Sequence, residues 1–348
     1  MSPRLLLVGN PSAQSGKNAE RITHARAVLD EAGLAHGFLA TLPGGRTVGA
    51  VSDALRAQPG VDTVIAMGGD GTFAEVAKGL LASGRDVRLA MLPTGTANDQ
   101  GKSFGLEASA EALPRNVDVI RRGEETRLDV GTIVALDGDG RVLRQDQFFD
   151  SAGWGISPRV LAQRNEDRRE IEDIPGLRDI LRDHAVYAGA ALKTFLASYV
   201  QDQKFDAVVH ADGKTLRWDG LTDLVIKATR VYGGMWVFDP TARHDDGLFE
   251  IVPFIGKRDW SSKAIVSLDA TGALAEGLAE IGVSHSEHLR GAKIELELLE
   301  HEGGEPIFGQ IDGEEFNCPG SKRVRIEVKK QALRLVVPHV YASAHEHG

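Results

Sequence analysis

A strand-to-helix turn at residues 64–77 constrains the fold of this chain more than any other part of the sequence. Residues 64–67 form an apolar run that is typical of a buried strand, and two glycines end it. Asp70, a third glycine and Thr72 follow, and a helical pattern begins at Phe73. Such a turn directs backbone N–H groups and a helix N-terminus to one point, which favours phosphate binding. The alternative is an ordinary tight turn with a helix-capping acid.

Two further strand-end turns have the same character. Residues 89–99 run from an apolar strand into threonines and a glycine, and Asn98 or Asp99 can cap the helix expected to follow. Residues 5–17 resemble a P-loop, but the glycines are spaced too far apart and Asn18 replaces the magnesium-binding Ser or Thr. Parallel strands bring their carboxyl ends to one edge of a sheet, so the three turns predict a single nucleotide site. Three unrelated loops are the alternative.

Several segments together resemble the diacylglycerol kinase catalytic superfamily, which includes bacterial lipid kinases, sphingosine kinases and ceramide kinases. Each segment alone is a weak signal, but they occur in the family's order and cover nearly the whole chain. The segments are Asn10-Pro11 with Ser15-Gly16, Gly68-Gly69-Asp70-Gly71-Thr72, residues 93–99, 148–155, 245–249 and 310–314. The resemblance implies an ATP-dependent kinase that phosphorylates a hydroxyl of diacylglycerol or a related lipid and uses Mg²⁺.

The resemblance also implies a set of nucleotide-binding residues in the cleft between two domains. Most of them lie in the three strand-end turns, and Thr41 is expected to touch the nucleoside. The set is Asn10, Ser15, Gly16, Thr41, Gly68, Gly69, Asp70, Gly71, Thr72, Glu75, Thr94, Gly95 and Thr96.

Three acidic residues are candidates for the catalytic chemistry. Asp70 is unsuited to direct phosphate contact, because like charges repel, but it fits a site where it faces a cation or handles a proton. Asp312 lies at a predicted strand end before Gly313, where the chain bends and leaves carboxylates accessible. By resemblance, Asp312 is the base that accepts the hydroxyl proton, with Glu314 close by. The alternative for Asp312 is an ordinary Asp-Gly hairpin turn.

A second acidic segment, residues 245–249, resembles the structural Mg²⁺ site of the family. The resemblance suggests the Asp246 carboxylate with the backbone carbonyls of Arg243 and Leu248 as ligands. Magnesium prefers oxygen ligands and keeps several waters, so one carboxylate and two carbonyls suffice chemically. An Asp-Gly turn before a strand is the alternative. A catalytic Mg²⁺ that arrives with ATP is a separate expectation.

The pattern along the chain changes near residue 125. Before it, short apolar strands alternate with helical segments, which predicts an α/β domain with a parallel sheet, as in NAD kinases and diacylglycerol kinases. After it, strands of period two and Asp-Gly turns predict an antiparallel β-sandwich-like second domain, interrupted by helical stretches. Late strands are expected at 323–329 and 332–338, the latter returning to the first domain. The expected ranges are 1–127 with 332–341 for the nucleotide-binding domain, 128–331 for the acceptor-binding domain, 342–348 for a loose tail, and 176–199 and 260–281 for the interrupting helices.

The composition limits the class of protein. The 348 residues, 42% hydrophobic and 26% charged, exclude a disordered chain and suit about two domains. A single cysteine, Cys318, excludes a disulfide framework and a cysteine-based zinc site. The net charge of −10 argues against nucleic acid as a partner.

A lipid acceptor implies contact with a membrane surface. The apolar run after Arg4 is broken at residues 9–11, so we expect no secretory signal, and no run of about 20 apolar residues suggests a span. We therefore expect a cytoplasmic chain that visits the membrane as a peripheral protein. Residues 185–196 are a candidate lining for acyl chains, and ordinary helix packing is the alternative. A homodimer is left open.

One position departs from the family pattern, and three other functions compete with lipid phosphorylation. Asp150 stands where the pattern Phe-x-Asn-x-Ala-Gly has Asn, which adds negative charge near the expected cleft. An NAD kinase shares the Gly-Gly-Asp-Gly-Thr turn, but residues 93–99 fit lipid kinases better. A dinucleotide-binding dehydrogenase lacks a ribose-binding acid at the expected place. A non-catalytic nucleotide-binding protein is disfavoured because Asp70, Asp312 and Glu314 are all present.

Overall fold

The structure is a computed structural model of the chain. It describes residues 4–11, 17–95, 97–156, 158, 204–232, 236–237, 242–256, 289–301, 306–321 and 323–342.

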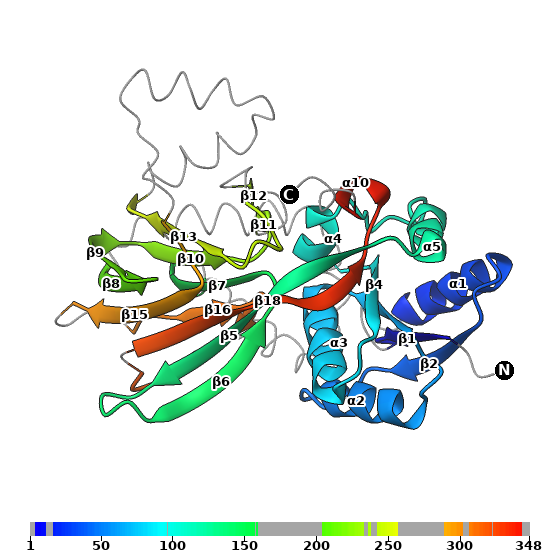
Figure 1. The fold of residues 1–348 in the computed structure, drawn as a ribbon, viewed down its shortest axis with the longest axis horizontal. Coiled ribbons are helices and arrows are strands. Elements are labelled where there is room, and N and C mark those ends of the chain that lie inside the picture. The colour runs from blue at the N-terminus through cyan, green and yellow to red at the C-terminus, as the bar shows by residue number, and fades with distance from the viewer. Residues whose placement is uncertain are drawn as a thin grey trace, which may run out of the picture.

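The N-terminal part is an α/β layer with a parallel sheet in the strand order β2-β1-β3-β4. Helices α1 and α5 pack on one face of this sheet, and α2 and α3 pack on the other (Figure 1). This confirms the predicted α/β class. The elements are β1 (Leu5–Gly9), α1 (Lys17–Glu31), β2 (His36–Ala40), α2 (Thr47–Ala57), β3 (Thr63–Gly68), α3 (Asp70–Ser83), β4 (Arg88–Pro93), α4 (Asp99–Ser103) and α5 (Leu113–Arg122).

The sequence of these strands is apolar without alternation because both faces of the sheet are covered. Successive side chains of a strand point to opposite faces. Leu6 and Val8 of β1 therefore join the core under α2 and α3, whereas Leu5 and Leu7 join the core under α1 and α5. Hydrophobicity alone does not distinguish a buried strand from a buried helix at fully buried residues such as Leu7.

One long strand, β18 (Arg323–Val336), links the parallel sheet to the antiparallel part of the molecule. It lies antiparallel to β5 (Glu125–Leu136) along its length, and its end pairs with β4 in the parallel direction at Leu335 and Leu89. The predicted return of the last segment to the first sheet is therefore confirmed. The prediction of two separate strands is wrong, since the Asp129 carboxylate accepts the backbone N–H of Gln331 (2.6 Å) and the strand continues through a bulge.

The described residues that follow form two antiparallel layers over a shared core (Figure 1). Strands β15, β8 and β9 extend the first sheet beyond β18, and a second sheet has the order β14-β13-β10-β7-β16-β17. The elements are β6 (Val142–Phe148), β7 (Ser151–Gly155), β8 (Phe205–Ala211), β9 (Lys214–Leu221), β10 (Asp223–Lys227), β11 (Val231–Tyr232), β12 (Trp236–Val237), β13 (Phe249–Phe254), β14 (Leu289–Gly291), β15 (Lys293–Glu300), β16 (Gly309–Ile311), β17 (Glu314–Glu315) and α10 (His339–Ala342).

These layers agree with the predicted antiparallel, sandwich-like region. The predicted hairpins β5–β6 and β8–β9 are both present. The expected domain boundary at residue 127 falls inside β5, which belongs to the sheet that runs through both parts. The expected helices at 176–199 and 260–281 and the tail from residue 343 lie outside the described residues.

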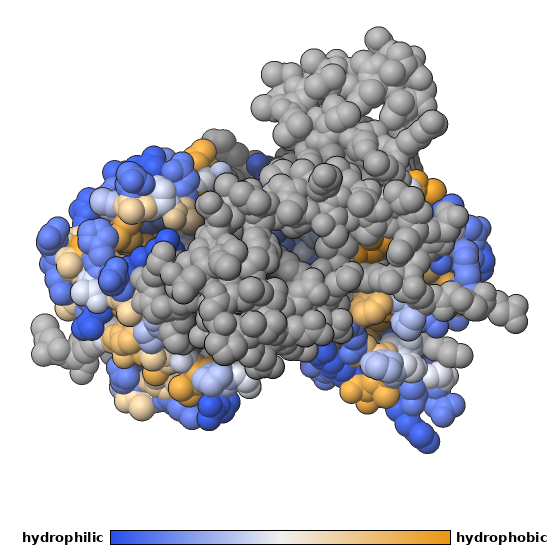
Figure 2. All heavy atoms as spheres, turned by 180° about the vertical axis from the view of Figure 1, so that it is seen from behind, coloured by the Kyte–Doolittle hydropathy of each residue, from blue (hydrophilic) through white to orange (hydrophobic). Residues whose placement is uncertain are grey.

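The described surface mixes hydrophilic and hydrophobic residues, as the rear view in Figure 2 shows. Its exposed large hydrophobic residues come from separate elements and include Phe38, Leu42, Val142, Leu216, Ile255 and Val340. None of the helices in the described ranges is long and apolar enough to span a membrane.

Candidate functional site

The predicted phosphate turns meet at the carboxyl edge of the parallel sheet. Asn10 follows β1, Thr41 follows β2, Gly68 ends β3 and Thr94 follows β4, and these strands are direct neighbours. Backbone hydrogen bonds extend the pairing beyond the strands, from Thr41 N to the Gly9 carbonyl and from Thr94 N to the Gly68 carbonyl (both 2.9 Å). Ser15, Gly16 and Thr96, which were also predicted to bind the nucleotide, lie outside the described residues.

Glycines allow two of these turns to touch backbone to backbone. A Cβ on Gly95 would lie 2.5 Å from the Cα of Gly69, which no ordinary contact permits. A Cβ on Gly68 would lie 2.4 Å from the Thr72 hydroxyl oxygen. The turns after β3 and β4 therefore form one continuous surface of backbone atoms at the start of α3, which suits a phosphate chain.

Of the two residues predicted to cap the next helix, Asn98 or Asp99, Asn98 occupies the N-cap position of α4, but its side chain makes no cap hydrogen bond. Its side chain instead closes the preceding turn, since Oδ1 accepts the Gly95 N–H (2.9 Å) and Nδ2 donates to the Gly95 carbonyl (2.6 Å). The start of α4 is capped by Asp70, whose Oδ1 accepts the backbone N–H of Gln100 (3.2 Å). Asp70 thus connects the turn after β3 to the helix after β4.

Asp70 has a perturbed acidity that fits a functional carboxyl. Burial raises its pKa, and the negative charge of Asp150 raises it further. Backbone N–H groups of Gln100 and Asp99 act in the opposite direction. The carboxyl therefore sits in a less polar environment than a surface acid, at the N-terminus of α3.

Asp312 is held by a cradle of backbone N–H groups from the link between β6 and β7. Its Oδ1 accepts hydrogen bonds from the N–H groups of Phe149 (3.1 Å), Asp150 (2.7 Å) and Ser151 (3.1 Å). Among the residues that the structure describes, its Oδ2 accepts the Phe149 N–H (2.9 Å) alone, so this oxygen keeps capacity for a further partner. Asp312 itself has a φ of 47°, the left-handed conformation that acidic and amide residues tolerate at tight turns.

The environment of Asp312 brings its acidity close to neutral pH. Burial raises its pKa to about 7, and the nearby charge of Asp150 acts in the same direction. The three N–H donors oppose this shift because they stabilise the ionised form. A carboxyl with a pKa near the working pH can both accept and release a proton, as a general base requires.

Glu314 joins this acid to the glycine-rich turn. A Cβ on Gly71 would lie 3.4 Å from Glu314 Oε1, so the carboxylate lies over the first turn of α3. The three predicted catalytic residues are thus linked: Asp70 belongs to that turn, and Asp312 precedes Glu314 in the turn between β16 and β17. Glu75, a predicted nucleotide contact, lies half-buried one helical turn further along α3.

A buried ion pair lies behind the cradle. Asp150 was singled out from the sequence, whereas its partner Lys227 was not. Lys227 Nζ donates to Asp150 Oδ1 (3.0 Å), and both side chains are at least 95% buried. The unexpected acid at position 150 was visible in the sequence, and a lysine ending the apolar strand β10 was the available signal for its partner. Residues 150 and 227 are far apart in the chain, so only the fold shows their contact.

The predicted magnesium ligands Arg243, Asp246 and Leu248 lie in the turn before β13. Asp246 Oδ1 accepts the backbone N–H of Leu248 (3.0 Å), and Arg243 pairs with Asp245 (3.1 Å). Asp129 of β5 supports the turn by accepting the Gly247 N–H (2.6 Å), and burial raises its pKa.

In the described part of the chain, no cluster of three or more His, Cys, Asp or Glu side chains could hold a metal ion. A site of the predicted kind, with one carboxylate and two backbone carbonyls, depends on a different set of ligands. The magnesium assignment therefore stays a prediction.

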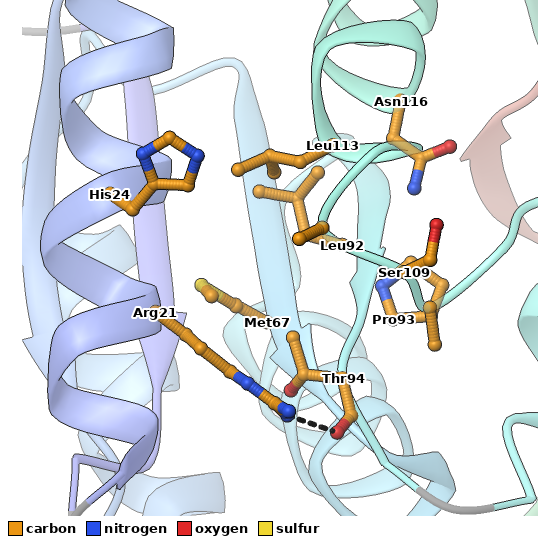
Figure 3. A pocket seen from close by; sticks show the side chains of 11 residues that line it. Arg21, His24, Met67, Leu92, Pro93, Thr94, Ser109, Leu113 and Asn116 are labelled. Atoms are coloured by element: carbon orange, nitrogen blue, oxygen red, sulfur yellow. Dashed lines mark hydrogen bonds between the residues drawn. The ribbon is translucent and has the colours of Figure 1, made fainter.

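A cavity of about 90 Å³ lies beside this site, between α1 and α5. Figure 3 shows Arg21 of α1 reaching across its mouth, where the guanidinium donates to the Thr94 carbonyl (3.3 Å). Met67, Leu92 and Leu113 form its apolar wall. The glycine-rich turn does not line this cavity, so Arg21 supports the Thr94 turn from the opposite face of the sheet.

Comparison with known proteins finds a matching family model and similar proteins named as lipid kinases. The model of the diacylglycerol kinase catalytic domain matches residues 4–133. A probable lipid kinase YegS-like protein of Pseudomonas aeruginosa (strain UCBPP-PA14) is 28% identical over 326 residues, covering 93% of this chain and 92% of that protein. A diacylglycerol kinase of Staphylococcus aureus (strain bovine RF122 / ET3-1) is 25% identical, covering 72% and 70%.

A solved structure agrees with the fold. The crystal structure of a diacylglycerol kinase from Bacillus anthracis str. Sterne superposes with a TM-score of 0.67 and 20% identity, over 97% of this chain and 98% of that one. The matched catalytic domain covers the parallel sheet and its turns, and the relatives extend over the antiparallel layers. The family model and the curated relatives support the diacylglycerol kinase catalytic superfamily for this chain.

Proposed function

We propose that the chain is an ATP-dependent lipid kinase that phosphorylates a hydroxyl group of diacylglycerol or a related lipid. The observation that carries this proposal is the meeting of Glu314 and the Asp312 turn with the glycine-rich start of α3. This meeting supports a site in which a candidate base lies near a candidate phosphate-binding surface. Kinases in the superfamily transfer phosphate from a nucleotide, and the relatives named as lipid kinases support a lipid acceptor.

The turns after β3 and β4 fit the phosphate chain of ATP. Gly69 and Gly95 lie backbone against backbone. Because neither has a side chain, a ligand can approach their backbone atoms directly. The N-terminus of α3 adds the positive end of a helix dipole at the same place. Asp70, held by α4, then lies at the phosphate end of the site, where Mg²⁺ bound with ATP would neutralise phosphate charge.

Asp312 carries the proton transfer in this proposal. Its Oδ2 accepts the proton of the acceptor hydroxyl while that oxygen forms its bond to the γ-phosphorus and the bond from phosphorus to the bridging oxygen of ADP breaks. The carboxyl is suited to this task because burial brings its pKa to about 7. The cradle from Phe149 to Ser151 fixes its orientation.

A second Mg²⁺ is proposed at the turn before β13, with a structural role. Asp246 Oδ2 and the carbonyls of Arg243 and Leu248 would hold it, and oxygen ligands suit this ion. Asp129 already orders the turn through Gly247, so the ion would stabilise the junction of β5 and β18.

An assay of ATP consumption against several acceptors tests the function. We expect ADP release and a phosphorylated product with diacylglycerol, sphingosine or ceramide as acceptor. Phosphorylation of NAD alone would show an NAD kinase-like enzyme instead. ATP binding without turnover on any acceptor would show a non-catalytic nucleotide-binding protein.

The lipid acceptor also leads us to propose a transient, peripheral contact with membranes. The candidate acyl-chain segment 185–196 lies outside the described residues, so this contact rests on the acceptor chemistry. Activity should rise when the acceptor is presented in vesicles or mixed micelles, and the protein should co-sediment weakly with them. Equal activity on a soluble, non-lipid alcohol without vesicle association would contradict this proposal.

A further inference from the structure

The buried pair of Lys227 and Asp150 has no place in the chemistry proposed so far. The resemblance predicts a neutral Asn at position 150, which would need no buried cation. We propose that Lys227 is a positioning residue, which acts on Asp312 through Asp150 by anchoring the backbone cradle and balancing the negative charge beside it. This inference rests on the proposed function, in which Asp312 is the base.

The anchoring follows from the contacts of Asp150. Its side chain accepts hydrogen bonds from Lys227 Nζ (3.0 Å), from the Ser151 hydroxyl (3.1 Å) and from the Thr229 hydroxyl. Its carbonyl accepts the N–H of Ala228 (2.8 Å). Asp150 is thus fixed to β10 through both its backbone and its side chain, while its own N–H points at Asp312 Oδ1 (2.7 Å). Movement of Asp150 would therefore move the base.

Lys227 is held in place from other directions as well. Its Nζ also donates to the Val231 carbonyl, and it lies 5.3 Å from the centre of the Tyr232 ring. The strand register places Lys227 opposite Ser151 on the neighbouring strand β7, next to the cradle. With 4% of its side chain exposed, the ammonium group cannot exchange Asp150 for water without a large rearrangement.

Lys227 also balances negative charge at the site. Four carboxyl groups gather around the site: Asp70 on α3, Asp150 in the cradle, Asp312 after β16 and Glu314 on β17. The negative charge of Asp150 raises the pKa of both Asp70 and Asp312. Lys227 supplies a positive charge on β10 in direct contact with Asp150, and this charge opposes the accumulation of negative charge.

Two variants separate positioning from simple packing: Lys227→Met, and the double variant that adds Asp150→Asn. Lys227→Met leaves Asp150 buried without its cation, so kcat should fall by up to about 10²-fold as the base is displaced. The acid limb of the pH–rate profile should move by about 1–3 units to higher pH, because the uncompensated charge makes Asp312 harder to ionise. The double variant removes both charges and should recover most of kcat. The acid limb of its pH–rate profile should return to the original pH or lie below it.

Lys78→Met is the matched control. Lys78 pairs with Asp146 in another partly buried ion pair, outside the cradle. Its loss should leave the acid limb in place. A Lys227→Met profile that keeps the original limb, or a double variant that stays as inactive as the single one, would overturn the inference.

A readout without substrate distinguishes this inference from the proposed function. Lys227→Met should lower the thermal unfolding temperature more at pH 8 than at pH 5, since Asp312 ionises between these pH values beside the unpaired Asp150. The double variant should lose most of this difference. If no acceptor is phosphorylated, the proposed function fails, and the pH dependence of unfolding still decides on the pair. A loss of stability that is equal at both pH values would refute the charge balance.

Discussion

Replacing Asp312 by Asn should change activity and stability in different, predictable ways. The amide keeps the size of the side chain and can still accept the N–H groups of Asp150 and Ser151 through its oxygen. It cannot take up the hydroxyl proton. We expect kcat to fall by about 10²–10⁴-fold, the usual contribution of a general base, with little change in ATP affinity.

The stability effect follows from the pKa. Burial and Asp150 raise the pKa of Asp312 from 3.8 to about 7 in the folded protein. A raised pKa favours folding while the group is protonated, so its contribution is fully present below pH 3.8 and is lost as pH rises through 7. At 1.36 kcal/mol per pKa unit, this loss is about 4 kcal/mol.

Urea denaturation of both proteins between pH 4 and pH 8 measures this loss. Because Asn does not titrate, the stability of the variant relative to the native protein should rise by about 4 kcal/mol over this range. Asp139→Asn, in the exposed β5–β6 turn, is the control and should give no such trend. A difference that does not depend on pH would refute the assigned environment of Asp312.

Three further substitutions test the rest of the site. Asp70→Asn should lower turnover and weaken the Mg²⁺ requirement, which steady-state kinetics at varied Mg²⁺ will show; near-normal turnover would rule out its role. Gly95→Ala should raise KM for ATP and cost about 1–3 kcal/mol of stability, because the new Cβ would lie 2.5 Å from Gly69, whereas Gly138→Ala meets no atom within 4 Å and should be neutral. Asp246→Ala should lower the unfolding temperature and abolish stabilisation by added Mg²⁺; a retained Mg²⁺ effect would exclude the proposed structural site.

The sequence located the glycine-rich half of the candidate site because that half is local. Strand, turn and helix follow one another within residues 64–77, and the glycine spacing shows where the backbone carries no side chain. The neighbouring turn after β4 repeats this order. Parallel pairing then brings the turns to one edge without further information.

The side chain that caps α4 could not be predicted from the sequence, because the capping depends on a contact across the sheet edge. Asn98 has the correct residue type and position for a cap, yet its side chain is occupied by Gly95. Asp70, which lies 30 residues before Gln100, accepts the N–H of Gln100 instead. The continuity of β18 was missed for a similar reason, since Asp129 of another strand satisfies the N–H of Gln331.

The sequence by itself therefore determined the α/β class, the antiparallel second region, the position of the glycine-rich turns and the identity of the candidate acidic residues. Only the tertiary structure decided how the acids meet. The N–H groups that hold Asp312 come from residues 161–163 positions earlier, and the cation that pairs with Asp150 lies 77 positions later. Periodicity and turn signals act over one or a few turns of chain, whereas pKa, charge balance and the placement of a base depend on groups that only folding brings together.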